Sequence, residues 1–246
     1  MVRGKRFRQS CPGVVPESPS RHFAASTVLP RPARPPISDC ILVFVRAPEA
    51  GRVKTRLAAE IGAGAALRVY RRLAEHAVGQ ARALGGEVAL RIHFTPADAE
   101  NEVRAWLGGG AEYLPQAEAE LGGRMRAAFA AAFAAGHRRV VIIGSDLPGL
   151  TADLLRDAFA RLDAHPVVLG PARDGGYYLL GLREMRPEIF RDIPWSTGAV
   201  FDATAERLAA LGITPARLPV LGDVDVAADL PAGWREWALR EGAVTA

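Results

Sequence analysis

Lysine is almost absent from this sequence of 246 residues, although arginine is plentiful. Lysine and arginine together number 31, yet only Lys5 and Lys54 are lysines. Lys5 lies in an irregular N-terminal stretch, so Lys54 is the single lysine of the part that reads as a folded domain. A strong preference for arginine would leave one lysine on the surface by chance. The alternative is a compact point charge kept to hold phosphate.

Cysteine is scarce as well, and long apolar runs are missing. Cys11 and Cys40 have no spacing typical of a metal or redox motif, and two thiols cannot form a disulfide framework. This usage predicts a reduced, cytoplasmic protein. No apolar run approaches the ~18 residues that a membrane-spanning helix needs, so we expect no membrane partner. The five histidines lack ligand spacing, and no GxGxxG motif or nucleophile elbow is present.

Positive charge is concentrated near the N-terminus. Residues 1–38 contain seven basic residues against Glu17 alone, a balance of +6, so the remainder is about −2 because the whole chain is +4. This mildly acidic balance gives no support for a nucleic-acid-binding surface, and no nucleic-acid partner is expected. The Pro-, Ser- and Arg-rich residues 1–38 predict a disordered leader or a mis-assigned start. Residues 39–246 are predicted to form a single domain.

Strand-like and helix-like segments alternate through that domain. Short apolar runs predict strands within 40–46, 87–94, 138–146, 166–172, 174–182 and 217–221. Patterns of helical period predict helices within 67–84, 98–107, 119–136, 151–162 and 198–211, and a last helix from about Val226. This order predicts an α/β fold with a doubly wound, mostly parallel sheet and helices on both faces. Ligands of such sheets bind beyond the carboxyl ends of the strands.

The first strand is followed by "RAPEAGRVKTRL" at residues 46–57. The loop lacks the spacing of a P-loop, but it combines glycine and proline with several cations at a helix start. Loop amides, a helix N-terminus and cationic side chains all favour anions. The predicted phosphate-binding residues here are Arg46, Gly51, Lys54, Thr55 and Arg56. A solvated charged surface is the alternative.

Two other segments offer carboxylates for a metal. Asp146, preceded by Ser145, follows a buried strand, where a carboxylate can hold Mg²⁺ or Mn²⁺ together with substrate phosphates. Asp146 could equally belong to an Asx turn. Asp225, in the run "GDVDVAADL", is a possible second ligand or the N-cap of the last helix, with Asp229 in its first turn.

The segment "GPARDGGYYLLG" at residues 170–181 joins two predicted strands. Its Asp-Gly pair is typical of a simple hairpin turn. Alternatively, Gly175 and Gly176 let the backbone approach a ligand that Asp174 and Tyr177 line. Trp195 in "PWST" is expected to serve packing.

Together these segments resemble the DUF2064 family of nucleotide-diphospho-sugar-transferase-like proteins, also described as radical-SAM/selenodomain-associated transferase 1. The resemblance is carried by "FVRAPEAGRVKTRL", "ELGGRMRAAF", "IGSDLPGLT", "GPARDGGYYLLGL", "IPWST" and "DVDVAADL". These run in the family's order from about residue 41 to 230. Arg46 stands where lysine is common in the family, and "DVDVAADL" departs from its usual Thr-Pro-Glu run.

The resemblance implies the glycosyltransferase-A fold, which binds a nucleotide diphosphate and a divalent cation. It implies that Arg46, Lys54 and Arg56, with Ser145, hold the phosphates. Asp146 would bind the metal with Asp225 as a possible second ligand.

By the same resemblance, Asp174 and Tyr177 would face the acceptor, with Lys54 and Asp174 in catalytic roles. The function so predicted is a metal-dependent glycosyltransferase that uses a nucleotide sugar and a small hydroxyl acceptor. The alternatives are a nucleotidyltransferase that uses a nucleoside triphosphate and releases pyrophosphate, or a non-catalytic nucleotide-binding protein. The oligomeric state is left open.

Overall fold

The computed structural model describes residues 1, 2, 4 and 38–240, so the predicted leader lies almost wholly outside the described residues. The chain divides into two units, Met1–Pro35 and Pro36–Ala246, and the fold below is that of the second. Its strands are β1 (Asp39–Arg46), β2 (Val88–Thr95), β3 (Glu112–Pro115), β4 (Arg139–Ile143), β5 (Val167–Pro171), β6 (Tyr177–Leu182) and β7 (Ala216–Arg217). Its helices are α1 (Thr55–Ile61), α2 (Ala63–Arg82), α3 (Glu100–Leu107), α4 (Leu121–Ala134), α5 (Ala152–Ala164), α6 (Val200–Ala210) and α7 (Trp234–Arg240), with 3₁₀ turns η1 (Pro187–Phe190) and η2 (Ala227–Asp229).

The seven strands form one sheet in the order β3-β2-β1-β4-β6-β5-β7. All neighbours are parallel except β6, which runs antiparallel to both β4 and β5. Val43 of β1 and Leu179 of β6 are both partners of Ile143, at the carboxyl end of β4. The loop after β1, the loop after β4 and the turn before β6 therefore meet at one edge. The predicted α/β class with a mostly parallel sheet is confirmed.

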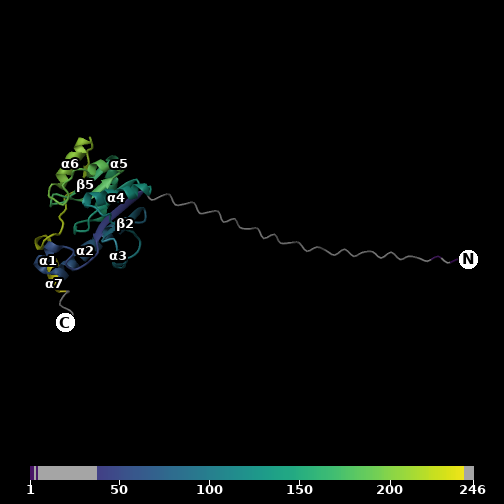
Figure 1. The fold of residues 1–246 in the computed structure, drawn as a ribbon, viewed down its shortest axis with the longest axis horizontal. Helices are drawn as coiled ribbons and strands as arrows, with labels where there is room; N and C mark the ends of the chain where they lie inside the picture. The colour runs from purple at the N-terminus through teal and green to yellow at the C-terminus, as the bar shows by residue number, and fades with distance from the viewer. Residues whose placement is uncertain (3, 5–37, 241–246) are drawn as a thin grey trace. The chain divides into compact units, whose positions relative to one another are not determined.

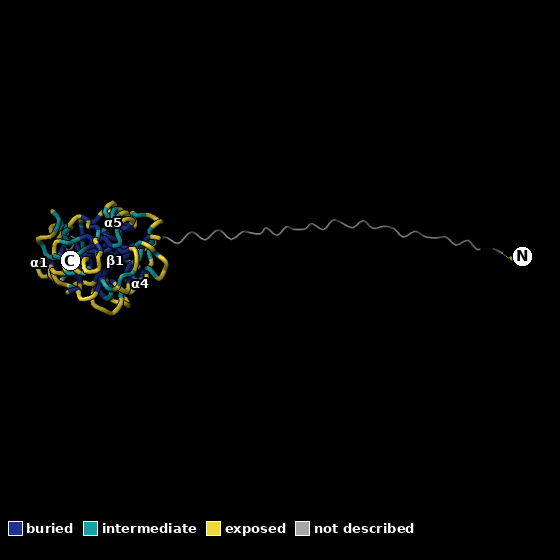
Figure 2. Tube along the Cα trace, turned by 90° about the horizontal axis from the view of Figure 1, so that it is seen from above, coloured by how far each residue is buried: buried dark blue, intermediate teal, exposed yellow. Residues whose placement is uncertain are grey.

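The strands bury alternate side chains against helices on opposite faces (Figure 1). Ile41 and Val43 join a core with α2, α3 and α5, whereas Cys40 and Leu42 join a core with α4 and α6. Each of these four side chains has no exposed surface, which is expected for a central strand covered on both sides. The buried part of the chain gathers around β1 (Figure 2).

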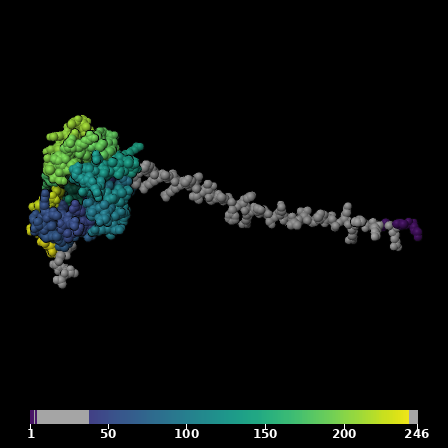
Figure 3. Space-filling model, viewed as in Figure 1, coloured from purple at the N-terminus to yellow at the C-terminus, as the bar shows by residue number. Residues whose placement is uncertain are grey.

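A third cluster joins the two ends of the domain's sequence. Leu57 and Ile61 of α1 and Leu73 of α2 pack with Val224 and with Ala238 of α7. The space-filling view shows the C-terminal segment against the segment that follows β1 (Figure 3). The packing holds the run 223–225 beside the loop that carries Lys54.

The prediction of a last helix from about Val226 is wrong in its start. Residues from Ala227 make only the short turn η2, and α7 begins at Trp234. The carboxylate of Asp229 accepts hydrogen bonds from the backbone N–H groups of Asp225 (3.0 Å) and Val226 (2.9 Å). Pro231 then follows, and proline has no N–H to continue a helix. The side chain of Asp225 is consequently not a helix cap.

The structure departs from the sequence prediction at three short elements. The expected strand at 217–221 is the two-residue β7, followed by one bridge between Ala172 and Leu221. The edge strand β3 and the turn η1 were not predicted, because both are short. Thr151 caps α5 by accepting a hydrogen bond from Leu154 N at 3.2 Å. Within the described residues, every helix is too short or too polar for a membrane crossing.

Candidate active site

Two cavities open at the edge where the three loops meet. The larger, of about 500 Å³, is lined by residues of β4, the β5–β6 turn and the segment 195–198, and by Asp223 and Asp225. The smaller, of about 320 Å³, is lined by the loop after β1 together with Tyr70 and Ser145. Arg56, Asp146 and Asp225 line both cavities, so the two spaces adjoin at these side chains.

The loop after β1 is fixed at its base by Tyr70 of α2. The Tyr70 hydroxyl donates to the carbonyl oxygen of Arg46 (2.8 Å) and accepts from its backbone N–H (2.7 Å). Burial raises the pKa of this phenol, so the hydroxyl stays protonated as a donor. The Arg46 guanidinium donates to the Arg52 carbonyl (3.2 Å) and closes the loop. Tyr70 lies in the helical pattern of residues 67–84, which does not show that its hydroxyl holds the loop after β1.

Lys54 lies at the junction of the two cavities. Its Nζ is 2.9 Å from Oδ2 of Asp146 and 3.2 Å from Oδ1 of Asp225, and only 5% of its side chain is exposed. Arg56, which is 78% exposed, reaches the other oxygen of Asp225 at 3.5 Å. Two residues predicted as metal ligands are thus brought together, 79 positions apart in the sequence, around the predicted phosphate-binding lysine.

The backbone supports this arrangement on both sides. Lys54 precedes α1 in the left-handed conformation, with φ of 48°, which is uncommon for a residue with a side chain. The carbonyl of Asp146 accepts a hydrogen bond from Val224 N at 3.1 Å. Asp223 and Asp225 therefore lie on either side of a residue anchored to the end of β4.

The smaller cavity contains most of the predicted phosphate-binding residues. Its lining includes Arg46, Lys54, Thr55, Arg56 and Ser145. Gly51 is not among the lining residues; its positive φ of 78° serves the turn between Arg46 and Arg52. The excess of cations over carboxylates in this cavity suits an anion, and Lys54 is neither solvated nor free.

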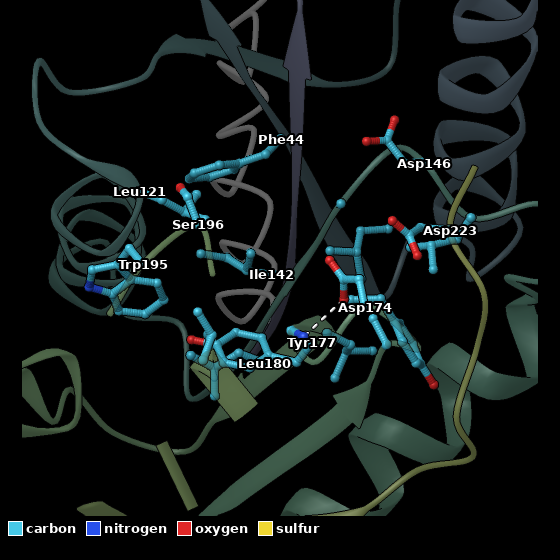
Figure 4. Close-up of a pocket in the computed structure, with 18 of the residues that line it drawn as sticks. Phe44, Leu121, Ile142, Asp146, Asp174, Tyr177, Leu180, Trp195, Ser196 and Asp223 are labelled. Atoms are coloured by element: carbon cyan, nitrogen blue, oxygen red, sulfur yellow. Dashed lines mark hydrogen bonds between the residues drawn. The ribbon is translucent and has the colours of Figure 1, made fainter. Parts of the chain in front are cut away.

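The β5–β6 turn forms part of the larger cavity. Asp174 Oδ1 accepts from Gly176 N at 2.9 Å (Figure 4). Ala172 N donates to the Gly176 carbonyl at 3.0 Å between the antiparallel strands β5 and β6, so the segment forms the hairpin turn that the sequence allowed. Gly175 has φ of 85°, and a Cβ there would lie 2.0 Å from the Gly198 carbonyl oxygen. Gly175 thus permits the close approach of the turn to segment 195–198, while Asp174 and Gly176 line the cavity.

Tyr177 contributes its ring to the cavity wall. The ring lies edge-on to Trp195, with centroids 6.3 Å apart. Burial raises the pKa of the Tyr177 phenol, and the nearby Thr204 hydroxyl opposes part of that shift. Because Thr204 belongs to the buried side of α6, the Tyr177 hydroxyl is directed to the core. The ring, rather than the hydroxyl, is the part available to a ligand.

Phe44, Leu121 and Trp195 complete the apolar wall of the larger cavity (Figure 4). Trp195 sits so close to α4 that a Cβ on Gly122 would lie 2.2 Å from its ring. Trp195 does pack, as expected, but it packs so that it also shapes the cavity. The Gly-Gly pair at the start of α4 is the sequence feature that could have indicated this close contact with Trp195.

The opposite wall is acidic and includes Asp223, a carboxylate of the run "GDVDVAADL" to which the sequence assigned no role. Asp146, Asp174 and Asp223 lie on this side of the cavity in Figure 4. Partial burial raises the pKa of the Asp223 carboxyl above its ordinary value, and the charges of Asp174 and Asp225 raise it further. A carboxylate with a raised pKa, beside a cavity, is a candidate proton acceptor.

The donor set fits a cation that is shared with a ligand. Among the described residues, no group of three or more His, Cys, Asp or Glu side chains is arranged to hold a metal ion. Asp146 and Asp225, however, already converge on one cation, the Lys54 ammonium. Mg²⁺ is commonly held by one or two carboxylates, with substrate phosphates and water completing the shell. The two carboxylates are therefore suited to such a partial site.

A family model described as an uncharacterized protein conserved in bacteria (DUF2064) matches residues 79–197. A crystal structure from Desulfovibrio desulfuricans G20, provisionally named a nucleotide-diphospho-sugar transferase, is 33% identical. The match covers 83% of this chain and 95% of that chain, with a TM-score of 0.74. A search of curated proteins gave no match.

More distant structures share the fold alone. A 4-diphosphocytidyl-2C-methyl-D-erythritol synthase from Anaerococcus prevotii DSM 20548 is 10% identical, with a TM-score of 0.52 over 83% of this chain and 96% of that one. A CMP:2-keto-3-deoxy-manno-octonic acid synthetase, complexed with CTP, is 16% identical, with a TM-score of 0.50 over 83% and 100%. The fold is that of the nucleotide-diphospho-sugar transferases, and the chain resembles transferases in general. It belongs to the DUF2064 family.

Proposed function

We propose that this protein transfers a sugar from a nucleotide-activated donor to a small hydroxyl acceptor with the help of a divalent cation. The observation that carries the proposal is the junction of the two cavities. A cation-lined space and an acidic, aromatic-walled space share Asp146, Asp225 and Arg56. A donor with its diphosphate in the smaller cavity would direct its sugar toward the larger one.

The diphosphate would be held by the chain's own cations. Lys54 and Arg56 would bind its oxygens and stabilise the negative charge that develops on the leaving group. Asp146 and Asp225 would hold Mg²⁺ or Mn²⁺, which supplies further charge neutralisation at the phosphates. The smaller cavity's cations support an anionic donor, and its buried lysine distinguishes it from an ordinary solvated surface.

The acceptor would lie in the larger cavity. Its apolar body would contact Trp195 and the ring of Tyr177. A carboxylate on the opposite wall would accept the proton of the attacking hydroxyl. Asp174 was predicted for this role; Asp223 is a second candidate because its carboxyl is partly desolvated and has a raised pKa.

A nucleotidyl transfer is the second candidate function. The smaller cavity contains Arg46, Arg52, Lys54 and Arg56, enough positive charge for a triphosphate. Such a reaction would release pyrophosphate rather than a nucleoside diphosphate. The two distant structures described above, one of which is complexed with CTP, share only the fold with this chain, so they do not favour nucleotidyl transfer.

A thermal-shift panel tests the proposed donor class. The full chain is heated with nucleoside diphosphates, nucleoside triphosphates and nucleotide sugars, each with and without Mn²⁺. Ligand that binds only the native state raises stability by RT ln(1 + [L]/Kd), so one nucleotide sugar with Mn²⁺ should give the largest shift.

Asp146→Asn removes a proposed metal ligand at nearly constant volume and serves as the matched variant. It should abolish the Mn²⁺-dependent part of the shift while keeping the unliganded melting temperature within a few degrees. A panel without any nucleotide-dependent shift would contradict the proposed function.

A further inference from the structure

The Lys54 ammonium occupies the position between the two carboxylates that a divalent cation would use. It contacts Oδ2 of Asp146 and Oδ1 of Asp225, and its side chain is almost fully enclosed. We propose that Lys54 excludes free divalent cation from the site, so that the metal enters only with a diphosphate that draws the lysine away. This inference rests on the proposed function, because it assumes a diphosphate donor and a metal.

The lysine and the metal cannot share these oxygens at the observed geometry. A Mg²⁺ ion binds oxygen at about 2.0–2.1 Å, so an ion on both carboxylates would lie close beside an ammonium that is itself 2.9 and 3.2 Å from them. At such a separation a monovalent and a divalent cation repel, and because the two carboxylates are 41% and 42% exposed, water screens part of this repulsion. Lys54 must leave at least one carboxylate before the metal binds.

The structure provides a destination for the displaced ammonium. Lys54 also lines the smaller cavity, where the other lining cations and Ser145 surround space for an anion. Rotation about the flexible side-chain bonds can carry Nζ from the carboxylates toward a phosphate oxygen there. The anion then replaces the charge partners that the ammonium loses, and the vacated oxygens accept the metal.

Binding of the two ligands is consequently coupled. In the absence of diphosphate, the metal-competent arrangement is a minor state, and the apparent metal affinity falls by the fraction of that state. Diphosphate raises the fraction, and linkage requires that metal strengthen diphosphate binding by the same factor. Lys54 thereby makes the site specific for a metal–diphosphate pair over either ion alone.

The scarcity of lysine allows a direct test by NMR. Lys5 and Lys54 are the only lysines of the chain, so ¹³Cε- and ¹⁵Nζ-labelled lysine gives two side-chain signals. The Lys54 signal is assigned by its loss in Lys54→Met, and the Lys5 signal is the internal reference. We expect Mg²⁺ alone to leave the Lys54 signal in place, and Mg²⁺ with inorganic pyrophosphate to shift it. A signal unmoved by magnesium pyrophosphate, or moved by Mg²⁺ alone, overturns the proposal.

Titration of Mn²⁺ alone, followed by the electron paramagnetic resonance of free Mn²⁺, gives a second readout. Lys54→Met should bind Mn²⁺ about tenfold or more tightly than the wild type, within the range of ordinary coupling energies. Lys54→Arg keeps the positive charge, so its affinity for Mn²⁺ alone should stay as weak as that of the wild type. Arg71→Met is the control for the loss of one positive charge. Arg71 lies on α2, 3.9 Å from Glu75, and this variant should bind Mn²⁺ with the affinity of the wild type.

These outcomes separate the inference from the proposed function. If Lys54→Met binds Mn²⁺ no more tightly than the wild type, exclusion by Lys54 is wrong even where the nucleotide panel is positive. If the panel gives no nucleotide-dependent shift, the proposed function fails whatever Lys54 does to Mn²⁺.

Discussion

Asp223 illustrates how a single side chain can serve a site at the expense of stability. Its carboxyl is partly buried beside Asp174 and Asp225, and these surroundings raise its pKa. A carboxyl whose pKa is raised in the native state holds its proton more tightly there than in the unfolded chain. The free energy of unfolding therefore falls as pH rises between the two pKa values, and the loss persists above both.

We therefore predict that Asp223→Asn raises the melting temperature at pH 7. The gain should shrink at acid pH, where the native wild-type carboxyl is protonated and uncharged. Glu118→Gln, on an exposed loop residue, controls for the loss of one negative charge. If Asp223 accepts the acceptor's proton, the same variant should lower turnover by about 10²-fold or more. A variant that melts lower than the wild type at pH 7 would instead make Asp223 a structural residue.

Some residues of the candidate site could be predicted because they follow a strand in the sequence, and others could not. Lys54, Asp146 and Asp225 were singled out by the sequence, and the structure brings their charged groups together. Asp223 could not be distinguished from its neighbours, because its surroundings depend on the turn that carries Asp174. Local spacing contains no information on such contacts between distant segments.

At the scale of elements, α4 and segment 195–198 act together on the wall of the larger cavity. Gly122 has no room for a side chain, since a Cβ would lie 2.2 Å from the Trp195 ring. Gly79 of α2 is also within a helix, but a Cβ there would meet nothing within 4 Å. Both glycines are helical, but only Gly79 has room beside it for a methyl group, so the two positions can be compared directly.

We predict opposite effects of alanine at these two positions. Gly122→Ala should cost about 1–3 kcal/mol, because the added methyl overpacks the contact with Trp195. Gly79→Ala should stabilise by about 0.5–1 kcal/mol, because it only restricts the backbone of a helix interior. Urea unfolding measures both.

The Trp195→Ala background should remove most of the Gly122→Ala penalty, as a double-mutant cycle would reveal. Equal effects of the two glycine substitutions, or an unchanged penalty without Trp195, would contradict the assigned contact.

The elements themselves were predictable to different degrees. Buried strands such as β1 and β4 were evident because continuous apolar runs are typical of strands covered on both faces. The start of the last helix was not, because a carboxylate from Asp229 caps a short turn and Pro231 stops it. Side-chain capping of the backbone competes with helix propensity and leaves only a weak trace in composition.

At the scale of the domain, the sheet brings the cation-lined loop after β1 and the acidic, aromatic cavity to one edge. The loops that carry Lys54 and Asp146 follow the parallel strands β1 and β4. Because β6 is antiparallel to β4, its first residue lies at the same edge of the sheet. The C-terminal run 223–225 closes the junction through Val224 and Asp225. One fold thus joins the proposed donor space and the proposed acceptor space through the charged residues that line both cavities.

The identity of the leaving group tests this account most directly. The full chain is incubated with Mn²⁺ and a set of hydroxyl acceptors, in parallel with nucleotide sugars and with nucleoside triphosphates, and the released phosphates are assayed. Sugar transfer predicts acceptor-dependent release of a nucleoside diphosphate from a nucleotide sugar, lost in Asp146→Asn. Acceptor-dependent pyrophosphate from a nucleoside triphosphate, with no nucleoside diphosphate from any sugar donor, would contradict it.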